Sequence, residues 1–218
     1  MIEGVNLNSI IKTMTNRWPD ILLCLGQHLK LTLIALICAI VIAVPLGIYL
    51  TRHKRFADTV IGITAIFQTI PSVALLGFMI PILGIGTLPA IVALTIYGLL
   101  PILRNTYTGI MGVDKSSIEA GRGMGMTSKQ ILFMVQIPLA STIIMAGIRT
   151  AAVLIVGVAT LASLIGAGGL GELIFRGIAS VDSVLILFGA VPAAILAIGI
   201  DFILKKLETK ATPRGLKN

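Results

Sequence analysis

The sequence predicts an all-α integral membrane protein with about five transmembrane helices, and three observations carry this prediction. Hydrophobic residues make up 56% of the 218 residues and charged residues only 12%, whereas soluble domains carry about 25% charged residues. The mean hydropathy is +1.03. Five continuous apolar runs are each long enough to cross a hydrocarbon core of about 30 Å.

The expected spans are residues 29–50, 60–83, 86–103, 141–165 and 184–204. Backbone polar groups in lipid must bond within their own segment, so these runs are expected to be helices. A β-barrel would instead need short alternating strands. Only a glycine or two joins the second and third runs, which predicts a tight helical hairpin. The first run is too long for the apolar part of a cleavable signal peptide, so it is expected to remain as an anchor.

The basic residues predict the orientation, because loops rich in Lys and Arg stay in the cytoplasm. The amino terminus is expected outside and the carboxyl terminus inside. Residues 1–28 then form an external segment, residues 29–204 the transmembrane domain, and residues 205–218 a basic cytoplasmic tail. The loops that this orientation places inside hold most of the basic residues: Arg52, Lys54, Arg55, Arg104, Lys115, Arg122, Lys129, Lys205, Lys206, Lys210, Arg214 and Lys217.

The formal net charge of +8 therefore has a simpler explanation than nucleic-acid binding. Basic residues beside membrane spans meet anionic lipid headgroups and hold the adjoining loops inside. A lipid bilayer, and no nucleic acid, is the expected partner of this charge.

One polar segment interrupts the apolar runs, SSIEAGRGMGMTSKQILFMVQIPL at residues 116–139. Ser116 to Glu119 fits a capping box, and Thr127 to Gln130 fits a second one. The sequence predicts two short helices joined by a glycine elbow at the membrane surface. Met124 and Met126 would place flexible apolar side chains on this elbow, which suits a partner's pocket; capped surface helices without a partner are also common. The residues expected to stop or bend these helices are Gly121, Gly123, Gly125 and Pro138.

The spacing in this segment resembles the cytoplasmic signature of permease subunits of binding-protein-dependent ABC importers. That signature is Glu-Ala-Ala, three residues, Gly, nine residues, Ile, any residue, Leu-Pro. Here Glu119 and Ala120 keep its start and Gly125 and Pro138 keep the spacing. The departures are small or conservative: Gly121 for Ala, Val135 for Ile and Ile137 for Leu.

Flanking runs extend the resemblance to osmoprotectant permeases of the Opu type, which serve glycine betaine, carnitine and choline. They are FQTIPSVALLGFMIPILGIGTLPAIVALTIYGLLPILRNTYTGI at residues 67–110 and AGIRTAAVLIVGVATLASLIGAGGLGELI at residues 146–174. The resemblance implies the MetI-like fold of a type I importer in a bacterial cell membrane. It also implies a coupling segment at residues 114–138 that docks on the ATPase, with contacts at Ser116, Glu119, Ala120, Gly121, Gly123, Met124, Gly125, Met126 and Pro138.

The same resemblance implies several partners: two ATPase subunits, a second permease subunit and an external substrate-binding protein. The sequence holds no G-x-x-x-x-G-K-[ST] loop, so ATP and Mg are expected to be used by a separate chain and no cofactor by this one. The spans carry almost no His, Cys, Asp or Glu, which argues against a membrane-embedded enzyme. Permeases for another small polar solute such as an amino acid, and stand-alone secondary transporters, remain the alternatives.

A glycine-rich motif at residues 166–171 matches G-x-G-x-x-G, but a membrane span rather than a strand precedes it. A nucleotide site is therefore not expected, and the motif predicts a tight external turn. The resemblance places this turn near an external gate and the docked binding protein, with Gly166, Gly168, Gly169, Gly171 and Glu172 as candidate contacts. His28 and His53 have no metal-ligand spacing, so no metal site is expected.

Polar residues inside the spans are the remaining candidates. Arg149 needs a partner in lipid, and Asp201 is the expected one; the alternative is that Arg149 lines the pathway. Pro71 predicts a kink in the second span, and the polar groups around it suggest a pathway lining of Gln68, Thr69, Pro71 and Ser72. No cluster of aromatic residues forms a trimethylammonium cage, so solute selection is expected to lie in a separate binding protein.

Overall fold

The computed structural model describes residues 7–211, and every regular element within this range is helical. Residues 1–6 of the predicted external segment and residues 212–218 of the predicted basic tail lie outside the described residues. The elements are α1 (Leu7–Arg52), α2 (Lys54–Thr69), α3 (Ser72–Leu83), α4 (Thr87–Met111), α5 (Lys115–Gly123), α6 (Ser128–Ile131), the π-helical turn η1 (Leu132–Gln136), α7 (Ile137–Ala159), the 3-10 turn η2 (Leu161–Ile165), α8 (Gly171–Ala179) and α9 (Ser183–Ala211).

Four helical stretches are long and apolar enough to cross a membrane, or five if the bent pair of α2 and α3 is one span. The four are Arg17–Arg52, Thr87–Met111, Ser128–Ala159 and Ser183–Lys210. The predicted all-α fold with about five spans is confirmed. Helix α1 runs without interruption through residues 28 and 29, so the predicted start of the first span is not a structural break.

The second span, predicted over residues 60–83, is not one straight helix, and the kink predicted at Pro71 is confirmed. It is broken between α2 and α3, which meet at an angle of 98°. Proline lacks an N–H and pushes the residue before it into an extended conformation. Ile70 accordingly has φ −68° and ψ 128°. The short glycine connection at residues 84–86 joins α4 to α3, which packs against it, so α3 alone forms the first arm of the predicted hairpin.

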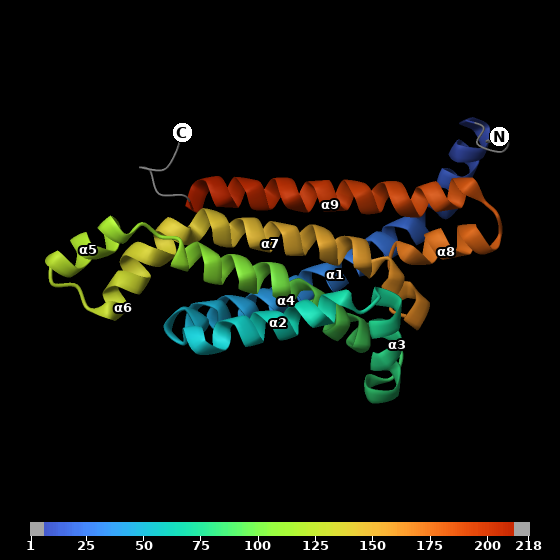
Figure 1. Cartoon of the computed structure of the whole chain (residues 1–218). Helices are drawn as coiled ribbons and strands as arrows, with labels where there is room; N and C mark the ends of the chain where they lie inside the picture. Colours follow the sequence, from blue (N-terminus) through green and yellow to red (C-terminus); the bar gives the residue numbers. More distant parts are fainter. Residues whose placement is uncertain (1–6, 212–218) are drawn as a thin grey trace.

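Helices α1, α4, α7 and α9 pack in sequence to form the bundle (Figure 1). Small side chains let α1 approach its neighbours closely, since Ala35, Ala39 and Ala43 are all fully buried in the main core. Without a hydrophobic drive between helices in lipid, such close packing supplies much of the association energy. Leu103 of α4 and Ile155 of α7 complete the centre of this core.

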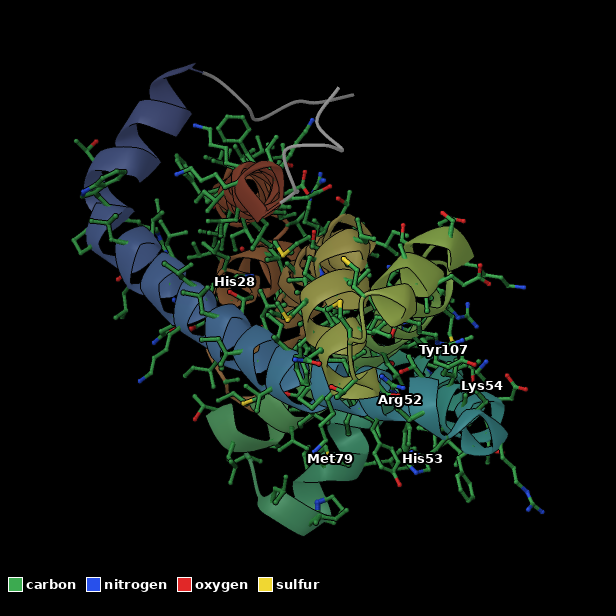
Figure 2. The ribbon with its side chains drawn as sticks, turned by 90° about the vertical axis from the view of Figure 1, so that its left-hand side faces the viewer. His28, Arg52, His53, Lys54, Met79 and Tyr107 are labelled. Atoms are coloured by element: carbon green, nitrogen blue, oxygen red, sulfur yellow. The ribbon has the colours of Figure 1, made fainter. Side chains whose placement is uncertain are left out.

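The two ends of the bundle carry different elements. Figure 1 shows α5, α6 and the carboxyl-terminal end of α9 at one end, and α8 with the amino-terminal part of α1 at the other. Arg52, His53 and Lys54 lie together at the α1–α2 junction (Figure 2). This junction lies at the α5–α6 end, because Arg52 contacts Ser128 of α6. The basic loops identified in the sequence thus gather at one end of the molecule.

Candidate functional site

The polar segment folds into two helices that project from the end of the bundle, as the sequence predicts (Figure 1). The predicted capping box at Ser116 is wrong, because α5 begins at Lys115 and its N-cap is Asp114. The Ser116 hydroxyl instead donates a hydrogen bond to the Asp114 carboxylate, and this bond holds the pKa of that carboxyl below its usual value. Asp is as good an N-cap residue as Ser, so the helix can start one residue earlier than Ser116.

The second capping box, at Thr127, is confirmed. The Thr127 backbone N–H donates to the Gln130 side-chain oxygen at 2.8 Å, and the Gln130 backbone N–H donates back to the Thr127 hydroxyl at 3.3 Å. This reciprocal pair fixes where α6 begins.

The elbow between α5 and α6 turns at Gly125, whose φ of +79° is the left-handed conformation that glycine adopts at low cost. Gly121 lies within α5 and does not stop it, whereas α5 ends at Gly123, as predicted. Met124 is 75% exposed at the tip of the elbow. Met126 is half-buried, with its Sδ facing Gly121. The elbow therefore offers one apolar side chain, not two, to a partner.

Of the two outcomes predicted for Pro138, a bend or a helix end, the structure shows no helix end. A π-helical turn joins α6 to α7, and the Ile137 N–H reaches back five residues to the Leu132 carbonyl. Proline cannot donate to the ordinary helical ladder, and a π-helical turn re-routes that ladder around it. The stretch Ser128–Ala159 is consequently helical without interruption from the elbow to the end of α7.

The break between α2 and α3 lines a hollow of about 290 Å³. Gln68, Thr69, Pro71 and Ser72 all line it, so the structure brings the four predicted pathway residues together. Further lining residues that the sequence did not single out are Tyr97 of α4 and Leu154 and Val158 of α7.

Two hydrogen bonds fasten the break to α4. Gln68 Nε2 donates to the Tyr97 carbonyl at 2.9 Å, and the Tyr97 hydroxyl donates to the Ile70 carbonyl. The Ile70 carbonyl is part of the irregular backbone at the break, which lipid does not tolerate unless the group is bonded. Tyr97 therefore stabilises the bend as well as lining the hollow.

Arg149 forms an ion pair with Asp201, as predicted, and the two side chains link α7 to α9. It also donates to Glu208 at 2.8 Å, which the sequence interpretation missed. The available signal was the spacing, since Glu208 follows Asp201 by two helical turns on the same face. A separate hollow of about 640 Å³ lies beside this pair and shares only Leu154 with the hollow at the break.

The glycine motif forms the predicted turn between η2 and α8, at the end of the bundle opposite the elbow. Gly166, Gly168 and Gly169 all have positive φ. Helix α1 holds this turn, because the Gly169 N–H donates to Gln27 Oε1 at 2.9 Å. Gly171 starts α8 so close to η2 that an added Cβ would overlap the Thr160 carbonyl oxygen.

A neighbouring contact on α1 supports the same turn. His28 is fully buried and its Nε2 donates to the Val156 carbonyl at 3.1 Å (Figure 2). A Cβ on Gly169 would lie 3.2 Å from His28 Nδ1. Glu172, the last predicted contact, pairs with Arg176 one helical turn later on α8.

The sequence that folds into this arrangement of a helical elbow, a broken span and a glycine turn matches the profile of a known protein family. The profile described as "binding-protein-dependent transport system inner membrane component" matches residues 43–213. The chain belongs to this family. It is a multi-pass membrane permease of the importer class, as the coupling signature predicted.

Curated relatives cover nearly the whole permease. It is 51% identical over 211 residues to the glycine betaine/carnitine/choline transport system permease protein OpuCB of Bacillus subtilis strain 168, covering 97% of each chain. Identity and coverage are the same for the carnitine transport permease protein OpuCB of Listeria monocytogenes. The carnitine transport permease protein OpuCD of Listeria monocytogenes is 46% identical, over 86% of this chain and 84% of that one.

A solved structure has the same fold. The permease matches a chain of the MetNI methionine ABC transporter in an inward-facing conformation with a TM-score of 0.76 and 28% identity, over 86% of this chain and 94% of that chain. The predicted MetI-like fold is confirmed.

Proposed function

We propose that this permease forms the translocation pathway of an ATP-driven importer for quaternary ammonium osmoprotectants: glycine betaine, carnitine and choline. The observation that carries the proposal is the 51% identity, over 97% of both chains, to a relative named for transport of these three solutes. The solutes share a trimethylammonium group, so one pathway without a solute-specific cage can serve all of them.

The energy comes from a separate ATPase that docks on the elbow. Met124, exposed at the tip, enters a groove of the ATPase, and Glu119 and Ser116 on α5 contact the walls of that groove. When two ATPase subunits close on ATP, they displace the elbow. The continuous stretch Ser128–Ala159 then carries this displacement into α7, because no break in helical structure separates the elbow from the membrane.

The pathway follows the break in the second span. The hollow at Gln68, Thr69, Pro71 and Ser72 lies against α7, so a movement of α7 changes its shape. The glycine turn at residues 166–171 and Glu172 form the outer gate and contact the solute-loaded binding protein. Arg149 stabilises the joint between α7 and α9 and is held away from the cationic solute by two carboxylates.

This function implies an orientation of the permease in the membrane and a set of partners. The elbow and the basic end of the bundle face the cytoplasm, and the glycine turn faces outward. A second permease subunit completes the pathway. The two differently named Listeria relatives, OpuCB and OpuCD, support a heterodimer as its form.

The test is uptake by a cell that lacks its own transporters for these solutes and that expresses the permease with the ATPase and binding protein of its host. After osmotic upshift, radiolabelled betaine, carnitine or choline should accumulate while ATP is present. Glu119→Arg should lower uptake by about tenfold or more, because a reversed charge at an interface costs several kcal/mol. Asp58→Arg, an equal charge reversal at an exposed site on α2, is the control and should leave uptake unchanged.

Co-purification tests the coupling to the ATPase separately from the class of solute that is transported. The ATPase should remain bound to the solubilised permease and be lost with Glu119→Arg. Uptake of a methionine-type amino acid and of none of the three osmoprotectants would overturn the solute class and leave the coupling role. Uptake without any ATPase would overturn the coupling role.

A further inference from the structure

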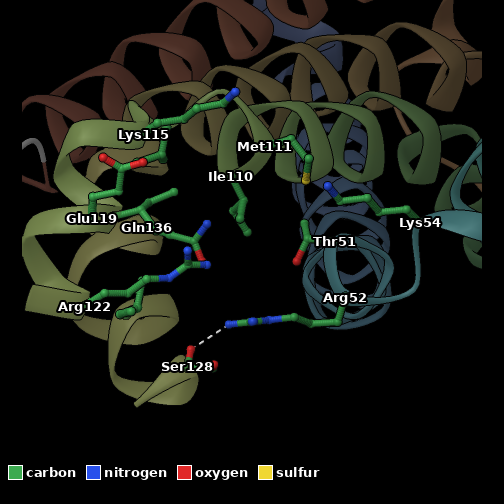
Figure 3. Close-up of a pocket in the computed structure, with 13 residues that line it drawn as sticks. Thr51, Arg52, Lys54, Ile110, Met111, Lys115, Glu119, Arg122, Ser128 and Gln136 are labelled. Carbon is green, nitrogen blue, oxygen red and sulfur yellow. Dashed lines mark hydrogen bonds between the residues drawn. The ribbon is translucent and has the colours of Figure 1, made fainter. Parts of the chain in front are cut away.

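A pocket of about 400 Å³ lies between the elbow and the ends of α1 and α4 (Figure 3). Arg52 and Lys54 line it from the α1–α2 junction, and Lys115 and Arg122 line it from α5. Glu119 is the single acidic residue among its lining residues. The pocket is distinct from the tip of the elbow, where Met124 is exposed.

These four basic side chains leave the pocket with an excess of positive charge. Within the part of the chain that the structure describes, none of them forms an ion pair. Arg52 is tied to the elbow by one hydrogen bond, from Nη2 to the Ser128 carbonyl at 2.6 Å (Figure 3). A carbonyl cannot neutralise a guanidinium, so the charge of the pocket is available to an anion.

The lining of the pocket also includes apolar side chains, and these bear on which class of anion the pocket can bind. Buried Ile110 and Ile131 contribute to its lining, together with Met111, which is 39% exposed. Two aromatic side chains are exposed on elements next to the pocket, Phe56 on α2 and Phe133 on η1, and neither is among its lining residues. Met111 thus gives the pocket an exposed apolar side chain, against which a lipid, unlike a small soluble anion, can place an acyl chain.

We propose that this pocket binds the phosphate headgroup of an anionic phospholipid. Several cations converging on one phosphate form strong charge-assisted hydrogen bonds, and basic pockets between transmembrane helices bind acidic headgroups. In the orientation of the proposed function, on which this step rests, the ends of α1 and α4 that line the pocket lie at the cytoplasmic membrane surface, beside the lipid headgroups. Because its cations come from both the α1–α2 junction and α5, one bound lipid would join the elbow to the membrane surface.

The test is native mass spectrometry of the full-length chain in detergent, titrated with phosphatidylglycerol and, separately, with phosphatidylcholine. Phosphatidylglycerol should bind saturably and more tightly. Lys54→Gln should weaken its binding by about 5-fold, and Arg52→Gln with Lys54→Gln by about 30-fold, since each cation contributes about 1 kcal/mol. Arg55→Gln, which removes an exposed charge next to the pocket, should leave binding unchanged. Lys54→Arg should retain it and shows that the site tolerates a replacement that keeps the charge.

Three kinds of result would overturn the proposal. The first is equal binding of the two lipids, or full binding by both Lys54→Gln and the double variant. The second is displacement of phosphatidylglycerol by inorganic phosphate at the same concentration, which would make the pocket a soluble-phosphate site. The third is displacement of the lipid by the purified ATPase, which would assign the pocket to an acidic segment of that partner. None of these measurements involves transport, so failure of the lipid proposal would leave the proposed function intact.

Discussion

Arg149 on α7 grips both carboxylate oxygens of Asp201 on α9, with Nε 2.8 Å from Oδ1 and Nη2 3.1 Å from Oδ2. Its remaining nitrogen, Nη1, donates to Glu208. A single cation thus serves two carboxylates across one helix interface. Loss of Arg149 therefore removes both ion pairs, whereas loss of either carboxylate removes only one.

This dependence predicts unequal effects of removing the partners. Arg149→Gln removes the cation of two ion pairs and should cost about 2 kcal/mol of unfolding free energy, whereas Asp201→Asn leaves the pair with Glu208 in place and should cost about 1 kcal/mol. Thermal unfolding of the detergent-solubilised chain measures the difference. Arg176→Gln, which breaks the exposed pair on α8, should change little. The charge-swapped variant Arg149→Asp with Asp201→Arg should regain its full unfolding temperature only when Glu208→Gln is added. Equal costs for Arg149→Gln and Asp201→Asn would contradict this account.

Tyr97→Phe should weaken the bend in the second span. The substitution removes the hydroxyl that donates to the Ile70 carbonyl, at a cost of about 1 kcal/mol. Uptake should fall, because the hollow at the break loses its fixed shape. Tyr107→Phe, on the same helix, is the matched control, since its hydroxyl makes no hydrogen bond within the described residues. Equal uptake by the two variants would remove Tyr97 from the account of the pathway.

Gly171→Ala should disrupt the outer turn. Its Cβ would overlap the Thr160 carbonyl, which is backbone and cannot move aside, and overpacking of this kind costs about 1–3 kcal/mol. We expect low expression or a lowered unfolding temperature, with loss of uptake. Gly157→Ala has open space around it and should be tolerated. A fully stable and active Gly171→Ala would show that the turn can shift.

Thr127→Ala should loosen the start of α6 by about 1 kcal/mol, because it removes the side chain that caps the helix. Hydrogen exchange at the backbone amides of Gln130 and Ile131, which both donate to Thr127, should speed up by about fivefold. Ser116→Ala is the informative comparison, since Asp114 rather than Ser116 is the N-cap of α5. Faster exchange in α5 after Ser116→Ala, and none in α6 after Thr127→Ala, would reverse the assignment of the two caps.

Local sequence was enough to predict the spans, the elbow and the Arg149 pair. Span length and hydropathy are properties of short windows. The Thr127 box is complete within four residues. Arg149 had to find a carboxylate because an unpaired charge in lipid is costly, and the five spans offered few candidates. Each of these conclusions depends on residues near one another or on a single strong constraint.

The structural features that could not be predicted from the sequence depend on contacts between distant elements. Pro71 predicted a kink, but the 98° angle reflects the packing of α3 on α4 and the bonds from Tyr97 and Gln68. The π-helical turn before Pro138 is a further local solution, beside the bend and the helix end that the sequence predicted. Tyr97 and Leu154 reach the same hollow from separate helices, which no local pattern indicates.

The central claim is that the elbow lies in the cytoplasm, within reach of an ATPase. The most direct measurement is thiol labelling of Met124→Cys in a chain that carries Cys24→Ala and Cys38→Ala, with a reagent that cannot cross membranes. Val181→Cys, 89% exposed between α8 and α9 at the opposite end, is its counterpart. The account predicts labelling at residue 124 only in inside-out vesicles and at residue 181 only in intact cells whose outer surface is accessible. Labelling at residue 124 from outside intact cells would contradict it.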